Sequence, residues 1–337
     1  MANKILVTLG PTSMSEKTVK TCAELGVYVF RINLSHTPLD QVEDSIKRIQ
    51  SWTDIPVCLD SEGAQLRNGS MVYENVEYIK GEEIRINIDS IVGDPNQLSF
   101  NPISVSKQFE VGDEVRVDFN RVIFKITGKF NDHYMANVKN SGFIGSNKAA
   151  DVNRDLKFDP LTVKDRKAIE IGLKNNVTNF AMSFANLPGD VDLMRELCGP
   201  KVNIICKIES PTGVKNLESI IERTDEILID RGDLSRRVPI ERIPFLQRRI
   251  ISTARSMNTP VFVATNLLES MITTQSPTRA EVNDVVSTLE MGANGLVLAA
   301  ETAIGKYPVE AVQMIRSLIN EFERWTPNTS IVDILRE

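Results

Sequence analysis

The chain has 337 residues, of which 42% are apolar and 25% are charged, a composition typical of a soluble globular protein. Its formal net charge of −6 argues against a nucleic-acid-binding protein, because contact with a phosphate backbone needs a basic surface. The sequence enters an apolar strand-like run at residue 5, and no apolar run approaches about 20 residues, so we expect a cytoplasmic protein with neither a signal peptide nor a membrane span.

Short apolar runs, each followed by a stretch with helical periodicity, recur along the chain. Three predicted strands come first, at 5–10, 27–34 and 56–60, with helices from about Ser15 to residue 26 and at 39–52. After a helix at 161–175 capped by Thr162, five more strands are predicted at 179–184, 202–209, 226–230, 260–266 and 295–301. Eight such units are the number that closes a (β/α)₈ barrel, although a doubly wound open sheet has the same rhythm.

Residues 64–150 have a different pattern. Apolar and polar residues alternate there at period two, for example at 83–88, 113–118 and 122–126, between turns rich in Gly, Asn and Asp. This pattern predicts a small, largely antiparallel β domain. The expected fold is therefore α/β: a (β/α)₈ TIM barrel formed by 1–63 and 151–337, with an inserted β-rich domain at 64–150.

Polar residues gather where the predicted strands end, which is the catalytic face of a (β/α)₈ barrel. Glu209 and Asp233 offer the oxygen ligands that Mg²⁺ and Mn²⁺ prefer. Lys207 and Arg31 suit a phosphate or a developing oxyanion. The run 230–233 is predicted to begin a short helix whose free N–H groups bind a carboxylate or phosphate. These residues predict a metal-assisted enzyme that acts on a small phosphorylated or carboxylated compound.

Other polar residues are weaker candidates for a site. Asp165, Arg166 and Lys167 fall in a helical segment and are predicted to be surface charges. The four cysteines lack the spacing of a zinc site and are expected to be reduced, buried thiols. Lys207 stands out because it ends a very apolar strand, where a charge without a partner is costly.

Seven segments, in this order, resemble successive signatures of the pyruvate kinase family. They are Thr-Leu-Gly-Pro at 8–11, Arg-Ile-Asn-Leu-Ser-His at 31–36, Lys-Ile-Glu at 207–209, Arg-Gly-Asp-Leu at 231–234, Ala-Thr-Asn-Leu-Leu-Glu-Ser-Met at 264–271, Pro-Thr-Arg-Ala-Glu-Val at 277–282 and the run at 301–311. Together they cover most of the barrel, and the insertion is similar to the B domain of that family. The family's C-terminal regulatory domain has no counterpart here, and we expect it to be absent.

The resemblance implies phosphoryl transfer between phosphoenolpyruvate, or a substituted analogue, and a nucleoside diphosphate. It implies catalytic roles for Lys207, Thr265 and Arg31. The residues implied to bind the substrate are Arg31, Arg231, Gly232, Asp233, Thr265 and Glu301. Those implied to bind the nucleotide are His36, Arg67 and Lys148. The divalent metal would be held by Glu209 and Asp233, and a possible potassium ion by Asn33, Ser35, Asp60 and Ser61.

Several positions depart from the pattern of the family. At the position of Gln65 the family usually has one of two charged residue types, which accompany potassium dependence or independence. Gln65 is neither of them, so potassium use stays open. Asp230 replaces a small apolar residue beside the expected anion site, and Ala299 removes a hydroxyl from the expected proton relay. Two alternatives therefore stay open, namely aldolase-like, metal-dependent enolate chemistry on a related keto acid and a non-catalytic paralogue. Because 277–282 resembles a subunit contact of the family, a homodimer is expected.

Overall fold

The computed structural model describes residues 3–63, 65–118, 120–326 and 328–335. The chain forms two compact units, one from 1–63 with 161–337 and the other from 64–160. Ala64, the predicted first residue of the insertion, lies outside the described residues. The predicted boundary at residue 150 falls inside strand β12 (Ala149–Val152). Because β12 pairs with two strands of the insertion, it belongs wholly to the second unit.

The first unit contains a closed parallel barrel. Its strands follow one another around the barrel in the order β1, β17, β16, β15, β14, β13, β3 and β2, so the open-sheet alternative is wrong. All neighbouring pairs run parallel. The strands are β1 (Lys4–Leu9), β2 (Val29–Asn33), β3 (Val57–Asp60), β13 (Asn179–Met182), β14 (Asn203–Ile208), β15 (Glu226–Asp230), β16 (Val261–Ala264) and β17 (Gly295–Leu298).

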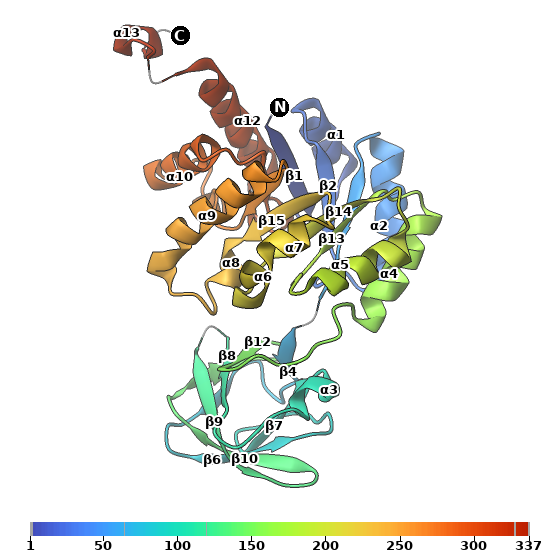
Figure 1. The fold of residues 1–337 in the computed structure, drawn as a ribbon, viewed down its shortest axis with the longest axis vertical. Coiled ribbons are helices and arrows are strands. Elements are labelled where there is room, and N and C mark those ends of the chain that lie inside the picture. The colour runs from blue at the N-terminus through green and yellow to red at the C-terminus, as the bar shows by residue number, and fades with distance from the viewer. Residues whose placement is uncertain (1–2, 64, 119, 327, 336–337) are drawn as a thin grey trace. The chain divides into compact units, whose positions relative to one another are not determined.

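Helices surround these strands, as Figure 1 shows. The Ser15 side chain caps α1 by accepting a hydrogen bond from the Thr18 N–H, as predicted from the sequence. The helices are α1 (Glu16–Glu24), α2 (Leu39–Trp52), α4 (Val163–Lys174), α5 (Pro188–Cys198), α6 (Pro211–Lys215), α7 (Leu217–Ile221), α8 (Arg231–Leu234), η1 (Ile240–Arg242), α9 (Ile243–Ser256), η2 (Glu269–Ile272), α10 (Arg279–Glu290), α11 (Ala300–Ala303), α12 (Pro308–Arg324) and α13 (Ile331–Ile334).

The outer and inner faces of the barrel belong to two different apolar clusters. Residues such as Ile5, Val7 and Phe30 belong to a large cluster that includes the buried faces of the surrounding helices. Their neighbours Leu6 and Val29 belong to a second, smaller cluster formed by the strands. Because successive strand residues point to opposite faces, the second cluster is the filling of the barrel interior. Its residues are Leu6, Val29, Cys58, Ala181, Ile205, Leu228, Phe262, Ala264 and Val297.

The second unit is β-rich, as predicted. Seven of its described strands close into a barrel in the order β10, β6, β7, β4, β12, β8 and β9, and β11 pairs with β5. The strands pair antiparallel except for β6 with β7. The elements are β4 (Leu66–Asn68), β5 (Val76–Tyr78), β6 (Glu83–Asn87), β7 (Gln97–Asn101), α3 (Ile103–Ser106), β8 (Glu114–Val117), β9 (Val122–Lys129), β10 (His133–Val138), β11 (Gly142–Ile144) and β12.

Asp165 is not the surface charge that the sequence predicts. Its side chain is fully buried at the start of α4, where it forms a capping box with Thr162. The carboxylate accepts hydrogen bonds from the backbone N–H groups of Thr162 (2.9 Å), Glu62 (2.7 Å) and Gly63 (3.1 Å). Helical periodicity alone could not reveal this, because the two distant donors follow β3. Asp165 thus fixes the segment that follows Asp60.

We expect Asp165→Ala to lower the free energy of unfolding by about 2–4 kcal/mol, because it removes a helix cap and leaves buried N–H groups without an acceptor. Chemical denaturation monitored by circular dichroism measures this change. Lys167→Ala is the matched control, since Lys167 is exposed on the same helix. The control should change the unfolding free energy by no more than about 0.5 kcal/mol. Equal stability of the two variants would contradict the assigned role.

The cysteines are free and buried, as expected from their spacing. Burial raises the pKa of Cys22, Cys198 and Cys206 to about 12, and it raises the pKa of Cys58 as well. We therefore expect Ellman's reagent to leave the native protein unlabelled, with no rise in rate between about pH 7 and pH 10, where an ordinary thiol ionises. All four thiols should react after denaturation. Rapid labelling of the native protein would contradict this prediction.

Candidate active site

Five polar side chains replace the apolar filling at the carboxyl end of the barrel. Period-two alternation places them on the interior face, because each follows an inward-facing residue such as Leu6 or Leu228 at a distance of two residues. The register joins the strands that carry them, since Thr8 is paired with Arg31 and Asn33 with Asp60. These five interior residues are Thr8, Arg31, Asp60, Lys207 and Asp230. Their position matches the catalytic end of a (β/α)₈ barrel.

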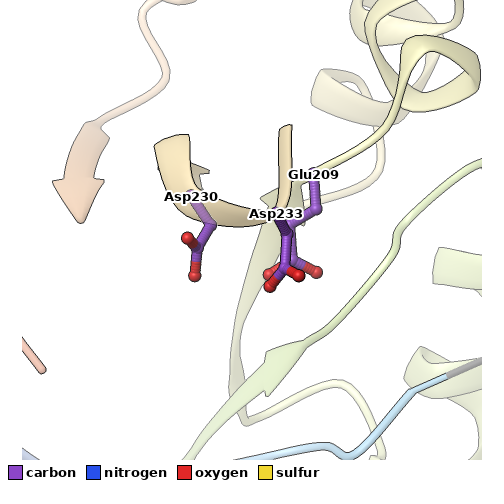
Figure 2. Close-up of side chains that lie close together, drawn as sticks. All are labelled: Glu209, Asp230 and Asp233. Carbon is purple, nitrogen blue, oxygen red and sulfur yellow. The ribbon is translucent and has the colours of Figure 1, made fainter. Parts of the chain in front are cut away.

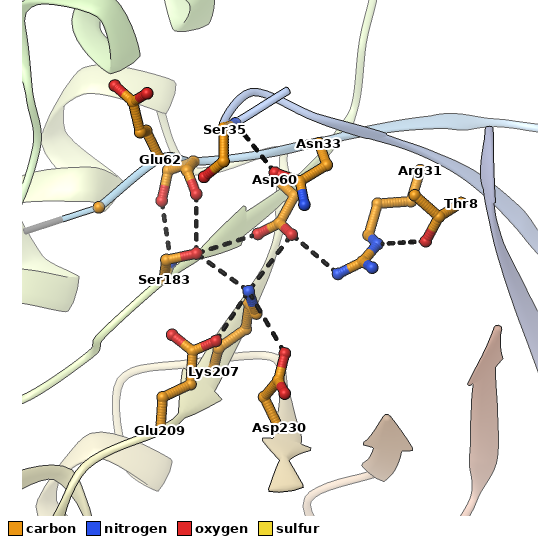
Figure 3. A network of polar contacts seen from close by, with 12 residues as sticks. Thr8, Arg31, Asn33, Ser35, Asp60, Glu62, Ser183, Lys207, Glu209 and Asp230 are labelled. Carbon is orange, nitrogen blue, oxygen red and sulfur yellow. Dashed lines mark hydrogen bonds and ion pairs between the residues drawn. The ribbon is translucent and has the colours of Figure 1, made fainter. Parts of the chain in front are cut away.

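Lys207 lies at the centre of this layer and is 5% exposed. Its ammonium group donates hydrogen bonds to Ser183 Oγ (3.0 Å) and Asp60 Oδ2 (3.3 Å). It also lies 2.8 Å from Glu209 Oε1 and 3.9 Å from Asp230 Oδ2. Figure 3 shows that these partners come from different strand ends and converge on the ammonium group. One buried cation thus holds several carboxylates together.

Burial by itself would lower the pKa of Lys207, but the charges of Asp60, Glu209 and Asp230 outweigh it and raise the pKa above its usual value. Lys207 is therefore a permanently charged group, not a base. A fixed positive charge in a poorly solvated site can stabilise an oxyanion or a transferring phosphoryl group.

Arg31 supplies a second buried cation. Its Nη1 donates to Asp60 Oδ2 at 2.8 Å, and its Nε donates to Thr8 Oγ1 at 2.8 Å. The Arg31 and Asp60 side chains are 3% and 0% exposed, so this pair is shielded from solvent. Asp60 is thus shared between Arg31 and Lys207, and its own negative charge fixes the positions of both cations.

Three carboxylates meet beside Lys207. Glu209, Asp230 and Asp233 each place an oxygen within 4.8 Å of the others, and Figure 2 shows their carboxylates side by side. Glu209 Oε2 accepts a hydrogen bond from the Phe184 N–H (2.7 Å). Its Oε1 is buried and lies 2.8 Å from the Lys207 ammonium, which supplies the opposite charge.

The local electrostatics favour a bound cation. Burial raises the pKa of Glu209; Lys207 opposes this rise, but the nearby charges of Asp233 and Asp230 reinforce it. Hard divalent cations prefer such oxygen ligands. The three carboxylates of Glu209, Asp230 and Asp233 therefore fit Mg²⁺ or Mn²⁺.

Thr265 is held in an unusual backbone conformation after β16. Its φ of +76° is rare for a β-branched residue, and such strain persists only where neighbours enforce it. Arg231 provides that support, because Nε and Nη2 donate to the Thr265 carbonyl oxygen at 3.1 and 2.6 Å, while Nη1 donates to Asp284 at 2.6 Å. A Cβ on Gly232 would meet Thr265 Cγ2 at 2.8 Å, so the absence of a side chain lets α8 approach closely. These contacts aim the Thr265 hydroxyl at Asp230, where it donates at 2.6 Å.

We expect Arg231→Met to lower kcat by about 10- to 100-fold, because small displacements of a positioned group cost that much. Its role is to position Thr265, so steady-state kinetics should show the loss mainly in kcat. Asp284→Asn keeps both bonds to the Thr265 carbonyl and should stay within about threefold of wild type. A pair of variants with equal, small effects would contradict the positioning role.

Other predicted site residues are engaged in local contacts. Glu301 is buried and accepts hydrogen bonds from the N–H groups of Leu268 (3.2 Å) and Ala299 (2.9 Å), so it fixes the end of β17 and the loop before η2. Asn33 Oδ1 accepts from the Ser35 N–H at 2.9 Å. The Ser61 side chain accepts from the Ser183 N–H at 2.9 Å. Three of the four residues suggested for potassium, Asn33, Asp60 and Ser61, thus already use side-chain oxygens in bonds to protein groups.

The nucleotide candidates are divided between the two units. His36 follows β2 in the barrel unit. Arg67 lies on β4 of the second unit, where Nη1 donates to the Asn147 carbonyl at 3.0 Å. Lys148 is exposed just before β12, and its backbone N–H donates to Asn68 at 2.7 Å. Each of these contacts is internal to its own unit.

Sequence reasoning missed two partners of the site. Ser183 bridges Lys207 and the Ser61 carbonyl, to which its hydroxyl donates at 2.7 Å. Arg236 donates to Asp233 Oδ1 at 2.8 Å from the turn after α8. Ser183 could have been found, because it follows β13 at the same end of the barrel as the other site residues. Arg236 could not have been found, because the direction of its side chain depends on the conformation of the turn after α8.

Comparison with known proteins identifies the family. A family model described as the barrel domain of pyruvate kinase matches residues 1–312. The chain belongs to the pyruvate kinase family. A pyruvate kinase of Thermotoga maritima is 33% identical over 96% of this chain and 71% of its own length. A pyruvate kinase of Mycobacterium tuberculosis is 32% identical over 94% of this chain and 69% of its own length. Plastidial pyruvate kinase 3, chloroplastic, of Arabidopsis thaliana is 33% identical over 96% of this chain and 58% of its length.

The family assigned from the seven segments is thereby confirmed, together with its barrel and β-rich insertion. Across the described residues, no helix combines the length and apolar character needed to cross a bilayer.

Proposed function

We propose that this chain transfers a phosphoryl group between phosphoenolpyruvate, or a substituted analogue, and a nucleoside diphosphate, with a divalent metal. The observation that carries this proposal is the buried Lys207 cation, with Asp60, Glu209 and Asp230 around it at the catalytic end of the barrel. Membership of a family whose named relatives are pyruvate kinases supports the same reaction.

In the proposed mechanism, Lys207 stabilises the transferring phosphoryl group and the enolate oxygen by its fixed charge. Arg31 holds Asp60 and adds positive potential at the same end of the barrel. Thr265 and the backbone near Gly232 provide donors for the substrate, and Arg231 holds Thr265 in place. Glu209 and Asp233 would hold Mg²⁺ or Mn²⁺. When bound, the metal neutralises charge on the phosphoryl oxygens.

The remaining assignments are proposed residue by residue. His36, Arg67 and Lys148 bind the nucleotide, and Asn33, Ser35, Asp60 and Ser61 form a potassium site. Glu301 binds the substrate. A cytoplasmic location and a homodimer complete the proposal.

A coupled assay with phosphoenolpyruvate, ADP and Mg²⁺ tests the function. We expect pyruvate formation to require ADP and to stop when the metal is removed by chelation. Enolisation of pyruvate by a chain that binds no nucleotide would instead indicate the aldolase-like alternative. Binding of metal and phosphoenolpyruvate without turnover would indicate a non-catalytic paralogue. The family comparisons favour neither alternative.

A further inference from the structure

Asp230 accepts hydrogen bonds from donors at the candidate site. One of its oxygens, Oδ1, accepts hydrogen bonds from the Thr265 hydroxyl (2.6 Å) and the Gly232 N–H (3.2 Å). The other, Oδ2, faces the Lys207 ammonium at 3.9 Å. An entering anion needs groups of this kind: a hydroxyl, a backbone N–H and a cation. The protein's own carboxylate already occupies them.

The other cations near Lys207 are also paired with carboxylates. Arg31 contacts Asp60, and Arg236 contacts Asp233. Lys207 itself contacts Asp60 and Glu209. An anionic substrate therefore enters a site where the carboxylates outnumber the cations that contact them, and it must displace one of these carboxylates to gain a donor.

Asp230 is the carboxylate that is easiest to displace from Lys207. Its side chain is 13% exposed, whereas Asp60 and Glu209, the two closer partners of Lys207, are 0% exposed. It is also the farthest of the three from the ammonium group. Asp60 is fixed by Arg31 and Glu209 by the Phe184 N–H, so neither can leave without exposing a buried partner.

We propose that Asp230 is a specificity-determining residue that competes with the carboxylate of the substrate for Thr265 and Gly232. The inference rests on the proposed function, because it concerns the keto-acid end of that reaction. The chain then binds a small α-keto carboxylate more weakly than the same site would without Asp230. A substrate that presents a hydroxyl or an ammonium group to Asp230 is disfavoured less.

Calorimetric titration of pyruvate into the Mn²⁺-loaded full chain tests the proposal. Asp230→Ala frees both donors and should tighten pyruvate binding by about tenfold or more. Asp230→Asn is nearly isosteric, and its amide oxygen can still accept both hydrogen bonds, so its gain should be clearly smaller. Combining Asp230→Ala with Thr265→Val should abolish most of the gain, because the hydroxyl donor is then lost.

Mn²⁺ titration and circular dichroism of each variant show whether the metal site and the fold are retained. If Asp230→Ala binds pyruvate no more tightly than wild type, the proposal is wrong. It is also wrong if Asp230→Asn gains as much as Asp230→Ala, since charge repulsion alone would then explain the effect. If the predicted order of affinities is found but no variant transfers phosphate, the proposed function fails and the role of Asp230 stands.

Discussion

Replacing Lys207 with alanine is expected to lower kcat by about 10³-fold or more, because the site loses the fixed charge aimed at the transferring group. The side chain has no substitute within the described residues: Arg31 contacts Asp60, but no ion pair joins it to Glu209 or Asp230. Steady-state assays at saturating phosphoenolpyruvate and ADP measure the loss. Activity of Lys207→Ala equal to wild type would remove the basis of the assigned mechanism.

The same substitution should also destabilise the fold. Asp60 and Glu209 are fully buried, and losing their shared cation leaves them poorly compensated, at a cost of about 3–5 kcal/mol. Activity must therefore be measured where circular dichroism shows the variant to be folded. Lys207→Arg keeps the charge and separates the two effects, with stability largely retained and kcat still reduced. Lys215→Ala, at an exposed lysine, should change neither quantity.

Glu209→Gln is expected to weaken Mn²⁺ binding by more than about 100-fold. Even changes to residues that only hydrogen-bond to metal ligands lower metal affinity by about 10- to 100-fold. Glutamine retains an oxygen for the Phe184 N–H, but it loses the negative charge that a divalent cation needs. Electron paramagnetic resonance of free Mn²⁺ measures the dissociation constant without any turnover.

Glu222→Gln is the matched control for this change, because Glu222 is exposed in the turn after α7. It should bind Mn²⁺ as wild type does. Unchanged Mn²⁺ affinity in Glu209→Gln would place the metal elsewhere.

The sequence was sufficient to predict the barrel and to select charged residues at its strand ends. Eight apolar runs with intervening helical periods predicted the strands because a parallel barrel buries both faces of each strand. Lys207 and Glu209 could be selected because the strand that they end is very apolar, and charges at such positions need partners. Arg31 could be selected because it lies near the end of the second predicted strand. The family signatures then linked these strand ends to one reaction.

The directions in which side chains point could not be predicted from the sequence in the same way. Glu301 and Arg231 carry the charges expected of substrate-binding residues, yet both use them to fix backbone groups in the loop after β16. Asp230 was recognised as unusual, but its bonds to Thr265 and Gly232 depend on the turn into α8. Asp165 was misassigned because its partners lie about 100 residues away in the chain.

We propose that the Lys207 site transfers a phosphoryl group between an enol phosphate and a nucleoside diphosphate. ³¹P nuclear magnetic resonance can follow this transfer in a mixture of wild-type protein, phosphoenolpyruvate, ADP and Mg²⁺. We expect the phosphoenolpyruvate signal to decay as the γ-phosphate signal of ATP grows, and we expect Lys207→Ala to abolish both changes. Release of inorganic phosphate without ATP, or equal transfer by folded Lys207→Ala, would contradict it.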